Sequence, residues 1–234
     1  MKFACIALVA TASLASAADA GFVGWVCRQR ETNTHYIMDV YAGMSAPTDK
    51  LLNVFNANIA TTNGSTFFQG ATAGTNKWRP TLVVANIDDI DSFVTLGGFD
   101  DGGTYYCGDT TTADPNFTNY ATANATTIAP NAGWYTADPT SPQTAAISLA
   151  GMPGVSGRGG TNASYGVWVA HFATLKSGAG PLAGVSFSAS AAFNSGTNAS
   201  DQRMFYWEII PAPGALALLG LAGLAPRRRK ETTR

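Results

Sequence analysis

The stretch GVSFSASAAF, residues 184–193, decides the fold class of this chain. Val185, Phe187, Ala189, Ala191 and Phe193 alternate with small residues, most of them serines. Successive side chains of a β-strand point to opposite faces, so this alternation predicts a strand with one apolar face and one polar face.

The neighbouring sequence predicts more strands of the same kind. SYGVWVAHFATL, residues 164–175, is apolar on both faces and is typical of a central, fully covered strand. Further candidates are residues 35–42, 50–59, 65–69, 91–99, 104–108, 144–151 and 202–210, separated by turn signals such as Asn63-Gly64 and Gly102-Gly103. About ten strands with no long helix predict a single all-β domain, an antiparallel β-sandwich or jelly roll, over residues 21–208. Residues 50–59 also suit one or two turns of helix.

The first 20 residues have the layout of a secretory signal peptide. Lys2 precedes an apolar stretch, and small residues then offer cleavage after Ala17 or after Ala20. We expect residues 1–20 to be removed on export and favour a mature chain that begins at Gly21.

The last 26 residues, 209–234, contain three parts in order. Pro211-Ala212-Pro213 comes first, then the uncharged run from Gly214 to Ala225, then Arg227, Arg228, Arg229 and Lys230. A helix over the apolar run would be about 18 Å long, short for a bilayer core of roughly 30 Å. The basic cluster resists translocation, so we expect transient retention in the inner membrane by a short apolar helix.

This three-part tail resembles the PEP-CTERM sorting signal of Gram-negative bacteria, with Ala212 in place of the usual Glu. In that family an exosortase of the inner membrane processes the tail, and the protein is delivered to the cell surface or matrix. LLNVFNANI, DSFVTLGGFD and GWYTADPTSPQ also resemble stretches of secreted PEP-CTERM proteins of planctomycete-type bacteria. The resemblance implies location and fold, and it implies the export machinery and an exosortase as partners; it implies no particular chemistry.

Charge and cysteine content narrow the range of partners. Six of the 14 basic residues and two of the 15 acidic residues lie outside residues 21–211, which leaves 8 basic and 13 acidic residues in the body. This acidic balance argues against a nucleic-acid partner. Cys27 and Cys107 remain once the leader is gone, and a cysteine pair in an exported protein predicts a disulfide.

Two sets of residues are candidates for ligand binding. Asp88, Asp89, Asp91 and Asp100 lie in the most acidic segment and are candidate Ca²⁺ ligands, although their spacing matches no EF-hand loop and solvated turns are the preferred interpretation. Trp78 and Trp134 lie next to turn residues and are candidates for stacking on sugars; packing under a loop is the preferred alternative.

Motifs for catalysis are missing from the sequence. It contains no G-x-S-x-G, no HExxH, no P-loop and no dinucleotide fingerprint. His171 lies inside an apolar strand, where a hydrogen-bonded core histidine is expected more often than a catalytic base. The leading hypothesis is therefore an exported, non-enzymatic β-sandwich without a cofactor. A carbohydrate-binding module, assisted by Ca²⁺ or not, is the alternative, and a secreted hydrolase comes third.

Overall fold

The computed structural model describes residues 21–61, 65–70, 77–79, 83–84, 90–101, 104–108, 110–150, 155–157, 163–176, 185–194 and 202–210. Within β4, β6, β11, β14 and most of β7, the backbone alone is described. The predicted signal peptide and the sorting motif from Pro211 onward lie outside these residues.

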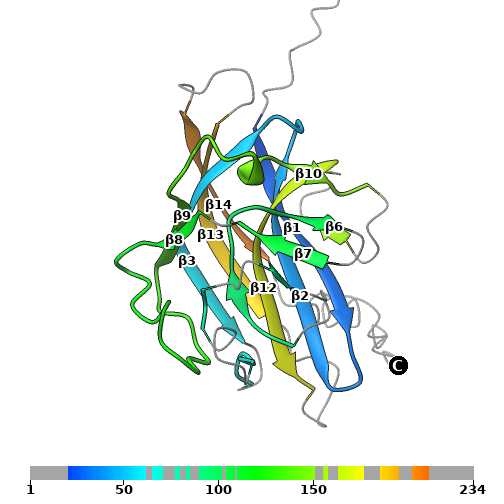
Figure 1. The fold of residues 1–234 in the computed structure, drawn as a ribbon, viewed down its shortest axis with the longest axis vertical. Helices are drawn as coiled ribbons and strands as arrows, with labels where there is room; N and C mark the ends of the chain where they lie inside the picture. Colours follow the sequence, from blue (N-terminus) through cyan, green and yellow to red (C-terminus); the bar gives the residue numbers. More distant parts are fainter. Residues whose placement is uncertain are drawn as a thin grey trace, which may run out of the picture.

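The described part of the chain is all-β, as the sequence predicts (Figure 1). It contains fourteen strands and one short 3₁₀ helix, η1 (Pro142–Thr144), with no α-helix among the described residues. Every strand pairing is antiparallel. The prediction of an all-β, antiparallel chain is therefore confirmed for the described residues.

The first sheet has six strands in the order β10-β12-β2-β1-β11, with β5 paired to β12. Its members are β1 (Phe22–Glu31), β2 (His35–Met44), β5 (Phe93–Val94), β10 (Ile147–Ser148), β11 (Val155–Gly157) and β12 (Tyr165–Leu175). β12 is buried from Gly166 to Thr174, which confirms the prediction that this strand is covered on both faces.

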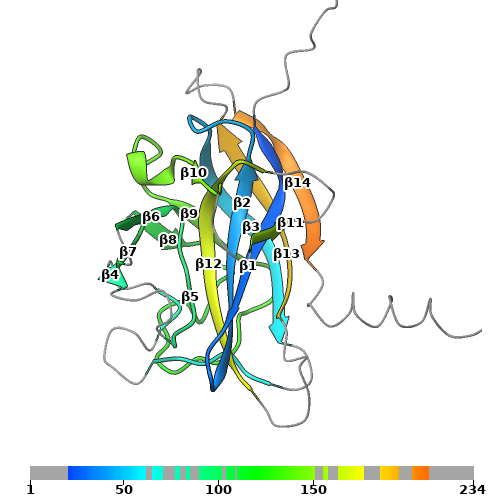
Figure 2. The same cartoon turned by 90° about the vertical axis from the view of Figure 1, so that its right-hand side faces the viewer.

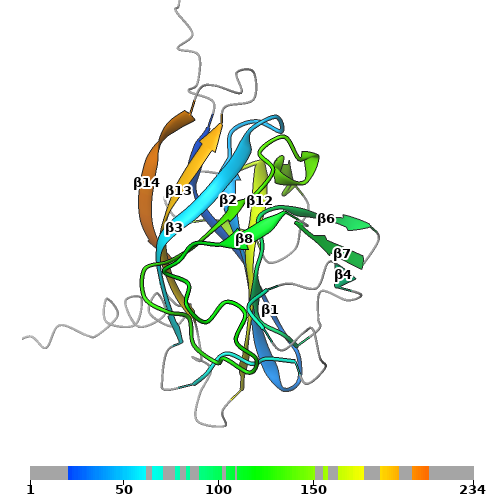
Figure 3. The ribbon, with the colours of Figure 1, turned by 60° about the vertical axis from the view of Figure 1, so that its left-hand side comes forward.

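The second sheet has five strands in the order β14-β13-β3-β9-β8 (Figure 3). Its members are β3 (Lys50–Thr61), β8 (Thr111–Ala113), β9 (Ala132–Thr136), β13 (Val185–Asn194) and β14 (Gln202–Ile210). Residues 50–59 thus form a strand that pairs with β13 and β9, and not a helix. Irregularities in this pairing, one of them at Asn56 (φ 50°), bring Leu51, Val54, Ala57 and Ile59 to the core face. A smaller sheet is formed by β4 (Val83–Val84), β7 (Thr104–Cys107) and β6 (Gly98–Asp101).

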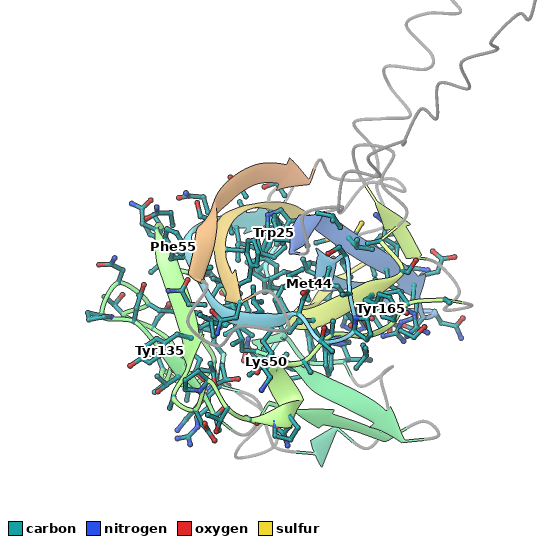
Figure 4. All side chains as sticks on the ribbon, turned by 90° about the horizontal axis from the view of Figure 1, so that it is seen from above. Trp25, Met44, Lys50, Phe55, Tyr135 and Tyr165 are labelled. Atoms are coloured by element: carbon teal, nitrogen blue, oxygen red, sulfur yellow. The ribbon has the colours of Figure 1, made fainter. Side chains whose placement is uncertain are left out.

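The two larger sheets face one another across an aromatic core (Figure 2). Trp25 of β1 packs edge-on against Phe187 of β13 with ring centroids 5.0 Å apart, and its indole N–H donates to the carbonyl of Ala189 at 3.2 Å. Trp25 and Met44 lie at the centre of this layer (Figure 4). Each buried side chain of this size contributes roughly 1.5–3 kcal/mol to folding, so the core between the sheets is the main source of stability.

A second apolar cluster covers the opposite face of the six-stranded sheet. It contains Val26, Tyr41, Phe93, Cys107, Leu149 and Trp168. Trp25 and Val26 are neighbours in β1 and point to opposite faces, so one strand contributes to both clusters.

The two cysteines of the domain lie in different clusters. The structure contains no disulfide between Cys27 and Cys107, and both are buried thiols. Cys27 belongs to the cluster between the two large sheets, whereas Cys107 belongs to the cluster on the opposite face of the six-stranded sheet. The predicted disulfide is therefore corrected: a β-sheet lies between the two side chains.

Candidate functional site

A row of polar residues crosses the six-stranded sheet on the face that Val26 and Trp168 share. The register places Arg28 of β1 opposite Asp39 of β2, and Asp39 opposite His171 of β12. The next residue across the sheet is apolar: Phe93 of β5 lies opposite His171. Four strands therefore bring together residues that are far apart in the sequence.

The carboxylate of Asp39 is the centre of this row. One oxygen lies 2.6 Å from Nδ1 of His171, and the other accepts from Nη2 of Arg30 at 3.2 Å. A carboxylate in an ion pair only accepts hydrogen bonds, so Nδ1 of His171 carries the hydrogen. Asp39 thereby joins β1, β2 and β12 through side chains as well as through backbone pairing.

Aromatic rings enclose the imidazole. The ring of Phe93 stacks on His171 with centroids 5.1 Å apart and an angle of 13° between the planes, and Trp168 meets it edge-on at 6.2 Å. The side chains of Asp39 and His171 have no exposed surface. A substrate cannot contact a group that is fully covered, so this arrangement supports a structural ion pair and agrees with the interpretation of His171 as a hydrogen-bonded core histidine.

The structure gives one of the predicted Ca²⁺ ligands a structural role. Oδ1 of Asp91 accepts from the backbone N–H groups of Gly70 and Ser92, both at 2.9 Å. Asp88 and Asp89 lie outside the described residues, and Asp100 is described only as backbone, opposite Tyr105 in the β6–β7 pair. Within the described ranges no three His, Cys, Asp or Glu side chains are grouped to hold a metal ion.

Trp78 and Trp134, the candidates for stacking on sugars, are core residues, which agrees with the preferred alternative of packing. Trp78 and Trp134 have 0% exposure. The indole of Trp78 donates to the carbonyl of Thr127 at 3.0 Å, and that of Trp134 donates to the carbonyl of Thr95 at 2.9 Å. Phe67 packs edge-on against Trp78 at 5.2 Å, so no ring face is left for a ligand.

The polar segment 110–133 packs against these tryptophans: Thr127 accepts from the indole of Trp78, and Phe117 contacts Trp134. It includes β8 and the start of β9, and Phe117 and Ile128 enter the core. Asp114 accepts from the backbone N–H groups of Asn116 and Phe117, which forms the turn after β8. Burial raises the pKa of Tyr120, which packs against Phe117, to about 12.

Two large apolar side chains are exposed among the described residues: Tyr135 (40%) and Leu175 (51%). Tyr135 directly follows the buried Trp134 in β9, so its ring points to the outer face of the five-stranded sheet. Tyr135 is not among the binding residues predicted from the sequence. Period-two alternation in GWYT, with Trp inward and Tyr outward, is the signal that identifies it.

No helix among the described residues is both long enough and apolar enough to cross a membrane. Comparisons of the chain with protein-family models, with curated proteins and with solved structures found no match.

Proposed function

We propose that this chain is an exported, non-enzymatic β-sandwich of the jelly-roll type, displayed at the cell surface or held in the extracellular matrix. The export machinery removes residues 1–20, and an exosortase-type enzyme of the inner membrane processes the tail at Pro211-Ala212-Pro213. The short apolar run and the Arg227–Arg229 cluster retain the chain in the membrane until processing occurs.

The observation that carries the proposal is the extent of the fold. β1 begins at Phe22, directly after the favoured leader cleavage site at Ala20, and β14 ends at Ile210, directly before Pro211. Processing at both sites therefore leaves every described strand intact. The predicted domain boundary at residue 208 moves by two residues, because Ile209 and Ile210 pair with Ser188 and Phe187 of β13.

The packing of the chemically reactive side chains supports a non-enzymatic role. His171 and Asp39 are hydrogen-bonded to one another, and Asp91 accepts a hydrogen bond from the backbone N–H of Gly70. Burial, and then the charge of Asp91, raises the pKa of the Cys107 thiol, so this sulfur is a poor nucleophile. The two large sheets that face one another support the sandwich assignment.

Surface display in cells with and without the exosortase tests the proposal. The full chain is compared with a chain that ends at Ile210 and with an R227Q/R228Q/R229Q variant. We expect surface display of the full chain only when the exosortase is present, and release of the truncated chain into the medium. Equal display of the full and truncated chains would contradict a sorting role for the tail.

A further inference from the structure

The outer face of the five-stranded sheet, which points away from the aromatic core, combines an exposed tyrosine ring with small polar residues. Tyr135 of β9 lies opposite Thr112 of β8 and opposite Asn53 of β3, and Asn53 lies opposite Ala192 of β13. This row crosses three gaps between strands, a distance of about 14 Å. Phe55 lies beside the row on β3, and it and Tyr135 lie on the far side of the sheet from Trp25 (Figure 4).

Serine hydroxyls and amides fill the rest of this face. Ser190 lies opposite Phe55, and Ser188 lies opposite Asn58, while their neighbours Ala189 and Ala191 turn into the core. The Oγ atom of Ser188 and the Oδ1 atom of Asn53 are buried, and neither has a hydrogen-bond partner. Both atoms are covered, so a ligand cannot reach them; the exposed side chain of Asn58 and the half-buried side chain of Thr112 are polar groups of this face that it can contact.

Charge is nearly missing from these strands. β3, β8, β9 and β13 contain one charged residue, Lys50, and its ammonium group donates to the carbonyls of Thr140 and Ser141. The other large sheet, by contrast, carries Arg30, Asp39 and the Lys176–Glu31 pair. The remaining strand of this sheet, β14, contains Arg203 and Glu208, so the uncharged part is the row from β8 to β13. This part offers nothing to an ionic ligand, and it imposes no cost of desolvating charge on a neutral one.

We propose that this face binds a neutral polysaccharide. The C–H face of a sugar ring packs on the exposed Tyr135 ring, and the sugar hydroxyls, which both donate and accept, meet the hydroxyl of Thr112 opposite it. A protein partner fits less well, because protein interfaces are depleted in Ser and Ala, the residues that dominate this face on β13. This inference uses the described sheet alone and does not depend on the sorting tail.

Native gels that contain a dissolved polysaccharide test the proposal on the full chain. The probes are hydroxyethylcellulose, glucomannan and dextran, with alginate as an anionic control. We expect at least one neutral polymer to slow migration and alginate to have no effect. Tyr135→Ala should weaken the retardation constant about tenfold, since one aromatic contact is lost, and Tyr135→Phe should retain it.

Leu175→Ala is the matched control, because among the described side chains Leu175 is the other large apolar one that is exposed, and it lies on the other sheet. Thr112→Glu is a second variant that leaves Tyr135 in place and should also weaken binding through its charge. The proposal is overturned if no neutral polymer retards the chain or if Tyr135→Ala and Thr112→Glu bind like the parent. It is also overturned if light scattering shows that Tyr135 instead holds two copies of the chain together.

Discussion

Asp39 and His171 are 132 residues apart in the chain, yet the carboxylate and the imidazole Nδ1 lie 2.6 Å apart with no exposed surface. Removal of one partner of a buried pair leaves the other charged or polar group without compensation. Asp39→Asn removes the charge that pairs with Arg30, so we expect a loss of about 3 kcal/mol in the free energy of unfolding, measured by urea titration.

Glu31→Gln is the control for this prediction. Glu31 pairs with Lys176 at 3.0 Å, but its side chain is 66% exposed. We expect a change of about 0–1 kcal/mol, as for other surface pairs. Equal effects of the two substitutions would show that the buried Asp39 pair contributes no more to the free energy of unfolding than the exposed Glu31 pair.

Gly97 is a position where a side chain cannot be accommodated. Its φ is +84°, and an added Cβ would collide with the carbonyl oxygen of Gln143 at η1. Its N–H also donates to the carbonyl of Trp168 at 2.8 Å, so the backbone cannot move aside without loss of that bond. Gly97→Ala should lower the free energy of unfolding by about 3 kcal/mol or more, judged from a thermal melt.

Asn124 provides a comparison for Gly97, because it has a φ of 57° but is exposed. Asn124→Ala carries only the cost of the left-handed conformation, about 1–2 kcal/mol. If Gly97→Ala costs no more than Asn124→Ala, the close approach to Gln143 is not a constraint on the fold.

His35 makes stability depend on pH. Burial lowers the pKa of His35 below 6.5, and its Nε2 atom has no hydrogen-bond partner. The unfolded chain therefore binds a proton more readily than the folded chain. The contribution of neutral His35 to the free energy of unfolding is thus present above pH 6.5 and is lost as pH falls from 6.5 toward the folded pKa. His35→Gln should flatten the fall in stability between about pH 7 and pH 5. An identical slope in parent and variant would contradict this assignment.

The cysteines should behave as two buried thiols. Without reductant, an alkylating reagent should leave both Cys27 and Cys107 unmodified in the native chain and modify both in urea, because both side chains are buried. Mass spectrometry counts the added groups. If the cysteines are labelled in urea only after a reductant is added, they form a disulfide, and their placement on opposite sides of a sheet is contradicted.

Local alternation was enough to predict much of the fold. Residues 184–193 and 164–175 form β13 and β12 as their patterns indicate, because period-two burial is a property of each strand alone. Residues 50–59 were ambiguous, since the bulge at Asn56 breaks the period that distinguishes a strand from a helix. The short strands β4, β8 and β11 lie outside the predicted strands, because their two or three residues are too few for a recognisable pattern.

The candidate sites were harder to predict, because they depend on which face of which sheet each residue occupies. Cys27 and Cys107 lie on opposite faces, and Trp134 points inward while Tyr135 points outward. The Asp39–His171 pair depends on the β2–β12 register, which no local pattern specifies. One signal was present: Asp39 and His171 each stand inside an otherwise apolar strand, and buried ionisable groups need partners.

Intact-mass analysis of the protein recovered from the cell surface tests the central claim, export with processing at both ends, most directly. We expect a chain that begins at Gly21, or at Ala18 if cleavage follows Ala17, and that lacks Arg227–Arg234. A surface protein whose mass includes the whole tail through Arg234 would contradict processing of a sorting signal.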